Sequence, residues 1–363
     1  MSAAGRSRAR QVRSLGRVGL VLAALWMSAG CWLTSDDGAP VEEADGPVAE
    51  LYVSPDGRDD WPGTEQQPWR TLRHALPSLE AGQVLYVRDG VYREQLVKLN
   101  LSKGRPASRI VVQAYEGEQP VVRGLLWLRD PSYWTVDGIN VTWDKALDTN
   151  AQHMVKLTGG VGWVWQGSEI WGARTGANVF ITGRGSGQPA DWSFTENCVH
   201  DLVPPSRVAR GSNIAVGAMD KAGPGSITRN VVFGSEPARN IALGVAESGS
   251  GGPTDVTVAY NTLYGARVAV SLSGDTSGSL IEGNLLGGPV SGALVRATQL
   301  EGAENVVREN AGVDAGRFYF EETGELKKGS GNVMVEVGFD DVSCEGLRSD
   351  DGSALTYGRD AVL

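Results

Sequence analysis

Asparagine recurs at the start of short apolar segments, and the spacing of these segments is the feature that most constrains the fold. They begin at Asn197, Asn230, Asn261, Asn284 and Asn310 and are 23 to 33 residues apart. A repeat of this length without helical periodicity predicts a β-solenoid, in which each coil contributes short strands that pair with the next coil. Asparagine suits a turn that needs a left-handed residue, and stacked side-chain amides can hydrogen-bond to one another.

Composition excludes several other classes of protein. The 363 residues include 49 glycines, about twice the usual share, without a Gly-X-Y repeat, so collagen is excluded. Three cysteines and three histidines exclude a disulfide scaffold and a cysteine-rich or histidine-rich metal module. The formal net charge of −10 disfavours nucleic acid as a partner.

The first 30 residues predict an export signal. Residues 1–17 hold five arginines and no acidic residue, and residues 18–26 form an apolar run too short to span a bilayer comfortably. The sequence Met-Ser-Ala-Gly-Cys at 27–31 resembles the lipobox of bacterial lipoproteins, with Ser28 where these usually have leucine. The resemblance implies removal of residues 1–30, lipidation of Cys31 as a membrane anchor, and an outer-membrane or cell-surface location. Cleavage by an ordinary signal peptidase, giving a periplasmic or secreted protein, is the alternative.

Residues 31–49 are rich in acidic residues, glycine and proline, and we expect them to form a flexible tether. Residues 50–363 are expected to form one solenoid domain. The repeat fades after Asn310, so about 313–363 is expected to be an irregular C-terminal segment that covers the open end of the solenoid.

Four motifs near the start of this domain carry a resemblance to a known fold. They are Tyr-Val-Ser-Pro-Asp-Gly at 52–57, Pro-Gly-Thr at 62–64, Pro-Trp-Arg-Thr-Leu at 68–72 and Val-Arg-Asp-Gly-Val-Tyr-Arg-Glu at 87–94. Together they resemble the opening of bacterial β-helix proteins with the pectin-lyase-like fold, which include pectate, alginate and chondroitin lyases. The resemblance covers roughly residues 50–360. It implies an all-β fold, a single-stranded right-handed parallel β-helix with a short N-terminal capping helix.

Three acidic residues are expected at one position of successive coils. Residues 238–247 align without gaps on 266–275, and 212–220 fit the same frame, which places Asp220, Glu247 and Asp275 in one column. Carboxylates about 5 Å apart on neighbouring coils repel unless they are solvated, protonated or bridged by a cation. Calcium is the cation that fits such oxygen ligands, and a solvated acidic column is the alternative.

The same alignment places Arg239 and Arg267 at one position. Two stacked guanidinium groups could bind the carboxylates of a uronic-acid polymer, and pairing with nearby acidic residues such as Glu236 is the alternative.

The catalytic candidates are Lys221 and Glu247. In polysaccharide lyases of the fold that this chain resembles, a lysine or arginine removes the proton next to the uronate carboxylate, which makes Lys221 the candidate base. A solvated surface lysine is the alternative. Glu247 together with a neighbouring carboxylate has the separation that a glycoside hydrolase needs, although any stacked pair would have it.

Trp163 and Trp165 alternate, so both side chains point the same way from one strand. They are expected either to fill the core or to offer their ring faces to a sugar. Cys198 and Cys344 are expected to be unpaired, mostly buried thiols, because nothing in the repeat brings them together. A disulfide is the alternative in an exported protein.

The sequence therefore predicts an exported, monomeric β-helix protein that binds or acts on a polysaccharide or another envelope glycan. A uronate polysaccharide lyase that works by β-elimination and a purely structural envelope protein are the alternatives.

Overall fold

The computed structural model describes residues 49–97, 99–147, 152–183, 187–202, 211–217, 223–234, 239–244, 251–288, 292–337, 339, 341–347 and 357–359. All of them belong to one compact unit, Pro47–Leu363. No helix in these ranges is long and apolar enough to cross a membrane.

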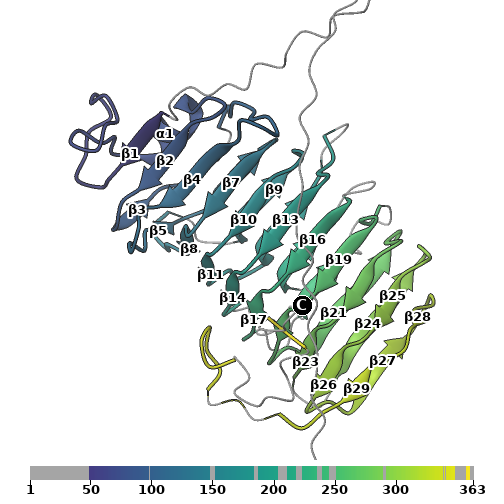
Figure 1. Cartoon of the computed structure of the whole chain (residues 1–363). Coiled ribbons are helices and arrows are strands. Elements are labelled where there is room, and N and C mark those ends of the chain that lie inside the picture. Colours follow the sequence, from purple (N-terminus) through teal and green to yellow (C-terminus); the bar gives the residue numbers. More distant parts are fainter. Residues whose placement is uncertain are drawn as a thin grey trace, which may run out of the picture. The chain divides into compact units, whose positions relative to one another are not determined.

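Three parallel sheets run the length of this unit, and the chain visits them in turn (Figure 1). In most coils the chain passes through sheet A, turns into sheet B, crosses to sheet C and returns to sheet A one coil further on. Every strand pairing within the three sheets is parallel, so the prediction of a parallel β-solenoid is confirmed.

Sheet A has 11 strands in the described residues. They are β1 (Glu50–Val53), β2 (Val84–Val87), β4 (Ile110–Ala114), β7 (Trp134–Asp137), β10 (Val164–Gln166), β13 (Trp192–Thr195), β16 (Gly225–Thr228), β19 (Val256–Ala259), β22 (Leu280–Glu282), β25 (Val306–Arg308) and β28 (Lys327–Lys328).

Sheet B has 10 short strands in the same ranges. They are β3 (Val91–Arg93), β5 (Val121–Arg123), β8 (Asn140–Thr142), β11 (Glu169–Trp171), β14 (Cys198–His200), β17 (Val231–Val232), β20 (Thr262–Leu263), β23 (Leu285–Gly287), β26 (Ala311–Val313) and β29 (Val333–Met334).

Sheet C has eight described strands, several of which are longer. They are β6 (Leu126–Arg129), β9 (His153–Thr158), β12 (Ala177–Thr182), β15 (Ser212–Val216), β18 (Arg239–Leu243), β21 (Val268–Gly274), β24 (Ala293–Leu300) and β27 (Arg317–Glu321).

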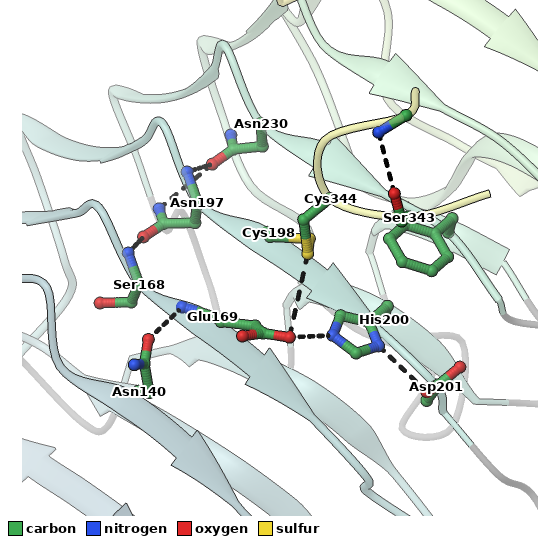
Figure 2. Close-up of a disulfide and its surroundings, with 12 residues drawn as sticks. Asn140, Ser168, Glu169, Asn197, Cys198, His200, Asp201, Asn230, Ser343 and Cys344 are labelled. Carbon is green, nitrogen blue, oxygen red and sulfur yellow. Dashed lines mark hydrogen bonds and ion pairs between the residues drawn. A yellow bond between two sulfur atoms is a disulfide. The ribbon is translucent and has the colours of Figure 1, made fainter. Parts of the chain in front are cut away.

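Buried asparagines form a ladder at the turn between sheets A and B, as the sequence predicts. The Asn230 side-chain oxygen accepts a hydrogen bond from the backbone N–H of Asn197, 2.9 Å away (Figure 2). The Asn261 side-chain oxygen accepts one from the backbone N–H of Asn230 in the same way. Each Nδ2 group also donates to the amide oxygen of the next asparagine. The ladder continues through Asn284 and Asn310 to Asn332.

The left-handed residue of this turn is the one before the asparagine. Glu196, Arg229 and Tyr260 have φ angles of 57°, 55° and 55°. Asparagine is therefore needed for its amide rather than for its own backbone conformation. A second, shorter column of buried amides joins Asn178, Asn213 and Asn240 at the start of sheet C strands, and the asparagine repeat in the sequence does not predict it.

Tryptophan fills the core of the early coils. Trp163 and Trp165 are only 2% and 1% exposed, and the Trp163 ring stacks on Trp192 with 5.3 Å between centroids. Their alternation does point both side chains the same way, toward the interior. The prediction that they bind sugar is therefore wrong, because neither ring face is accessible.

One α-helix, α1 (Leu72–Ser78), lies between β1 and β2. The Thr71 side chain accepts from the backbone N–H of His74 and so satisfies one of the free donors of the first turn. Leu72, Ala75 and Leu76 are buried and join the main core.

The C-terminal segment differs from its prediction in two ways. The regular coil continues to Met334, because β27, β28 and β29 add one strand to each sheet. Beyond it, the described tail residues pack along the outer side of sheet B rather than only across the end: Leu347 is buried against Cys198, Val231 and Phe233.

This arrangement brings together two cysteines that the repeat keeps apart. Cys198 and Cys344 form a disulfide, with 5.7 Å between their Cα atoms (Figure 2). The prediction of two unpaired thiols is therefore wrong. Its premise covered only the repeating coils, whereas Cys344 belongs to the returning tail, whose path the repeat does not determine.

Replacing Asn230 with alanine should lower the free energy of unfolding by about 2–5 kcal/mol, because a buried backbone N–H of Asn197 and the carbonyls of Phe194 and Thr228 lose their partner. Thermal and denaturant unfolding measure the loss. Asn100→Ala, at an exposed position, should change stability by less than about 0.5 kcal/mol. Equal stability of the two variants would contradict a structural role for the ladder.

Candidate functional site

The outer face of sheet C carries a row of residues that face away from the core. In β9, Val155 and Leu157 are at most 1% exposed and point inward, so Lys156 between them points outward. Strand register aligns Lys156 with Trp127 on β6 and with Phe180 on β12. We call this line of outward residues, continued through every described strand of the sheet, the sheet C row.

Lys156 lies between two aromatic rings in this row. Its Nζ atom is 4.3 Å from the centroid of the Trp127 ring and 5.5 Å from that of Phe180. The Arg129 guanidinium, two residues along β6, is 5.6 Å from the same Trp127 ring. Among the described residues, no carboxylate forms an ion pair with Lys156 or Arg129. This end of the row therefore holds two cations beside apolar ring faces.

The surroundings of Lys156 lower the pKa of its ammonium group. Partial burial of the ammonium group, followed by the positive charge of Arg129, lowers the pKa of Lys156 below its ordinary value. A lysine with a lowered pKa gives up its proton more readily than an ordinary surface lysine, as a general base must.

His153 completes this end of the site. Its ring stacks on Phe180, with 4.9 Å between centroids, and its Nδ1 atom lies 3.3 Å from the carbonyl oxygen of Ala177. Burial, and then the charge of Lys156, lower the pKa of His153 to about 4. At neutral pH the imidazole is therefore uncharged and adds no third positive charge beside Lys156.

Small side chains follow in the next three strands of the row. Ala215, Ala242 and Ser271 are in register with Phe180, and Arg296 and Phe320 come next. Arg296 lies 5.2 Å from the Phe320 ring but is bound to Glu322 at 2.9 Å. Five strand spacings of about 4.8 Å place Arg296 roughly 24 Å from Lys156.

Of the acidic column predicted from the sequence, only Asp275 lies within the described residues. Asp220, Lys221 and Glu247 lie outside the described residues. Asp275 is exposed just after β21, and its carboxylate accepts a hydrogen bond from the backbone N–H of Gly251 at 3.1 Å. Calcium at this column stays a prediction.

The arginine alignment is wrong by one residue. Register pairs Ile241 with Val270 and Arg239 with Val268, so the step between these coils is one residue longer than the gapless alignment assumed. Arg239 begins β18 and is half-buried, whereas Arg267 is exposed in the turn before β21. The two guanidinium groups therefore do not occupy the same position, because a turn can absorb an extra residue without disturbing the strands that follow.

The residues that the structure does bring together were not singled out from the sequence. A signal was present in the alternation of His-Met-Val-Lys-Leu-Thr at 153–158 and of Leu-Trp-Leu-Arg at 126–129. In each segment a charged residue alternates with aliphatic ones, which predicts an outward cation on a strand. Assigning both segments to the same sheet required the coil register, which the repeat spacing alone does not define.

Comparison with known proteins supports the fold. No protein-family model matches the chain. Among curated proteins, the pectate lyase PEL9 of Emericella nidulans is 30% identical over 107 residues, 24% of this chain and 26% of that protein. The uncharacterised protein YwoF of Bacillus subtilis is 43% identical over 75 residues, 20% of this chain and 15% of that protein. The matches thus span about a quarter or less of these relatives' length.

Two solved structures superpose over most of the solenoid. The crystal structure of the pectate lyase Pel9A matches with a TM-score of 0.53 at 9% identity, covering 78% of this chain and 80% of that one. A structure described as a glycoside hydrolase matches with a TM-score of 0.52 at 9% identity, covering 86% and 99%. At such identities the likeness establishes the right-handed parallel β-helix of the pectin-lyase type and nothing finer.

His153 should remain uncharged until the pH falls to about 4. The unfolded chain takes up this proton near pH 6.5, so His153 makes folding less favourable as the pH falls from 6.5 toward 4. Imidazole NMR signals, assigned through His153→Gln, measure the titration, and the variant should flatten the pH dependence of thermal stability in that window. Titration of His153 at or above 6.5 would contradict the burial described here.

Proposed function

We propose that this protein binds an acidic polysaccharide along the sheet C row and cleaves it by β-elimination, with Lys156 as the base. The observation that carries the proposal is the position of Lys156, between Trp127 and Phe180 and beside Arg129, with a lowered pKa. Aromatic faces stack on sugar rings, and a guanidinium binds a carboxylate through paired hydrogen bonds. The fold shared with a pectate lyase is consistent with this chemistry.

The reaction needs one base and one positive group close together. The neutral Lys156 amine would remove the proton from the carbon that bears the uronate carboxylate. The electron pair then forms a carbon–carbon double bond as the bond to the glycosidic oxygen breaks, and solvent protonates the departing oxygen. Arg129 would stabilise the negative charge that develops on the carboxylate before the bond breaks.

A second candidate function is binding without cleavage. The far end of the row favours it, because Arg296 and Phe320 repeat the pairing of a cation with an aromatic ring roughly 24 Å from Lys156. The experiment below separates the two functions, since only one of them yields an unsaturated product.

Calcium dependence is part of the proposal. The column predicted from Asp220, Glu247 and Asp275 would supply carboxylate oxygens, which calcium prefers. Chelation should then lower polymer cleavage or binding without unfolding the solenoid.

We also propose export and anchoring through Cys31, with the solenoid acting as a monomer at the outer membrane or cell surface. The basic and apolar pattern of residues 1–30 supports it. The Cys198–Cys344 disulfide supports it independently, because disulfides persist in oxidising compartments outside the cytoplasm.

Replacing Lys156 with alanine should lower the rate of β-elimination by about 10²–10⁴-fold, because the general base is lost. The measurement is ultraviolet absorbance of unsaturated uronates, with pectate, alginate and glycosaminoglycans as substrates, with and without a calcium chelator. Arg129→Gln should raise the Lys156 pKa and shift the rate profile toward higher pH, because a neighbouring positive charge is removed.

Lys327→Ala is the matched control, since Lys327 is exposed on sheet A and pairs with Glu304. It should leave the rate unchanged. Full activity in Lys156→Ala would refute Lys156 as the base. If the wild-type protein is retained by a polymer column but releases no unsaturated product, and Lys156→Ala is not retained, the protein is a binder.

Cys31→Ser should move the protein from the membrane fraction to the soluble fraction when it is produced in a bacterium. The loss of the acyl chains removes the anchor, and mass spectrometry of the mature N-terminus reports the change. An unmodified Cys31 in the wild-type protein would show that an ordinary signal peptidase processes the chain.

A further inference from the structure

A second cluster of reactive side chains lies on the outer face of sheet B, away from the sheet C row. Cys198 and His200 alternate along β14, so both side chains point outward, on either side of the buried Val199. Glu169 on β11 pairs in register with Cys198, and Cys344 arrives from the C-terminal tail (Figure 2).

The donor atoms of these four residues converge. The Sγ atoms of Cys198 and Cys344 and a ring nitrogen of His200 all lie within 4.8 Å of one another. Glu169 Oε1 is 2.8 Å from His200 Nε2 and 3.9 Å from Cys344 Sγ. Two sulfurs, one imidazole nitrogen and one carboxylate oxygen are a ligand set that tetrahedral zinc accepts.

The imidazole is held in place from three sides. Its ring lies parallel to the rings of Trp171 and Phe233, with centroids 5.8 and 4.8 Å away and interplanar angles of 3° and 2°. Asp201 Oδ2 lies 3.1 Å from Nδ1, the nitrogen opposite the one that faces Glu169. A carboxylate at that nitrogen is the arrangement that orients zinc-binding histidines in metalloproteins.

We propose that Cys198, Cys344, His200 and Glu169 form a zinc site when the disulfide is reduced. A dithiol reductant supplies two electrons, breaks the S–S bond and is itself oxidised, leaving two thiols on the protein. Zinc then displaces both thiol protons and binds the thiolates together with His200 Nε2 and Glu169. The two sulfur atoms are adjacent in the disulfide, and after reduction both thiolates can reach one zinc ion with Zn–S bonds of about 2.3 Å.

The site keeps the C-terminal tail attached to β14 in both the oxidised and the reduced protein. Cys344 belongs to the described segment 341–347, in which Leu347 is buried against Phe233 and Val231. Either the disulfide or the metal connects this segment to β14. The inference is independent of glycan binding, because the residues lie on another sheet.

The test uses the full chain with Cys31→Ser, which removes the third thiol. Oxidised and dithiol-reduced protein are each titrated with zinc against a chromophoric chelator, and with cobalt as a spectroscopic probe. We expect one metal per reduced chain, with the intense visible bands of tetrahedral cobalt bound to thiolate, and none per oxidised chain.

Variants distinguish this site from two thiols that bind metal alone. Glu169→Gln and His200→Gln should each weaken zinc binding by at least about 10-fold, and Asp201→Asn by about 10–100-fold. Glu169 is partly exposed, so its variant should fold normally, which circular dichroism checks. His74→Gln, at an exposed position on α1, is the matched control and should bind zinc like the parent.

Two results would overturn the proposal. One is reduced protein that fails to compete with the chelator while it remains folded. The other is zinc or cobalt binding that is equal in oxidised and reduced protein, or unchanged by both Glu169→Gln and His200→Gln.

Discussion

Each buried asparagine amide at the turn between sheets A and B connects three successive coils. Asn230 accepts from Asn197 in the coil before it, donates to the carbonyl of Phe194 in that same coil, and donates to Asn261 in the coil after it. A turn has no strand partner for its backbone groups, and burial would leave them unsatisfied without these side chains. The ladder thus makes a sharp turn compatible with a dry interior, and the close stacking of the sheets on either side depends on it.

The regular stacking of the coils also creates the candidate site. Parallel register carries one outward position from strand to strand, so residues about 30 positions apart in sequence become neighbours on sheet C. Trp127, Lys156 and Phe180 meet for this reason alone, and the partial burial that lowers the Lys156 pKa follows from their packing.

The sequence predicted the solenoid and the asparagine ladder, because both depend on a residue type that recurs at a fixed place in the successive coils from Asn197 onward. It failed for Arg239 and Arg267, since a turn between two coils holds one more residue than the gapless alignment allows. It failed for Trp163 and Trp165, because alternation states that two side chains share a face without stating which face. It missed the Cys198–Cys344 pair because the tail leaves the repeat, and only the folded path places it on sheet B.

The returning tail has a consequence for how the stack holds together. A solenoid stabilised only by neighbouring coils can open from either end, one coil at a time. The bond between Cys198 and Cys344 closes a loop with a sequence separation of 146 residues, which contains the coils from β15 to β29. Fraying from the C-terminal end then cannot free the chain, because the last residues are attached to the middle of the molecule. The disulfide thereby limits the conformations open to the second half of the solenoid once its coils separate, which makes their separation less favourable.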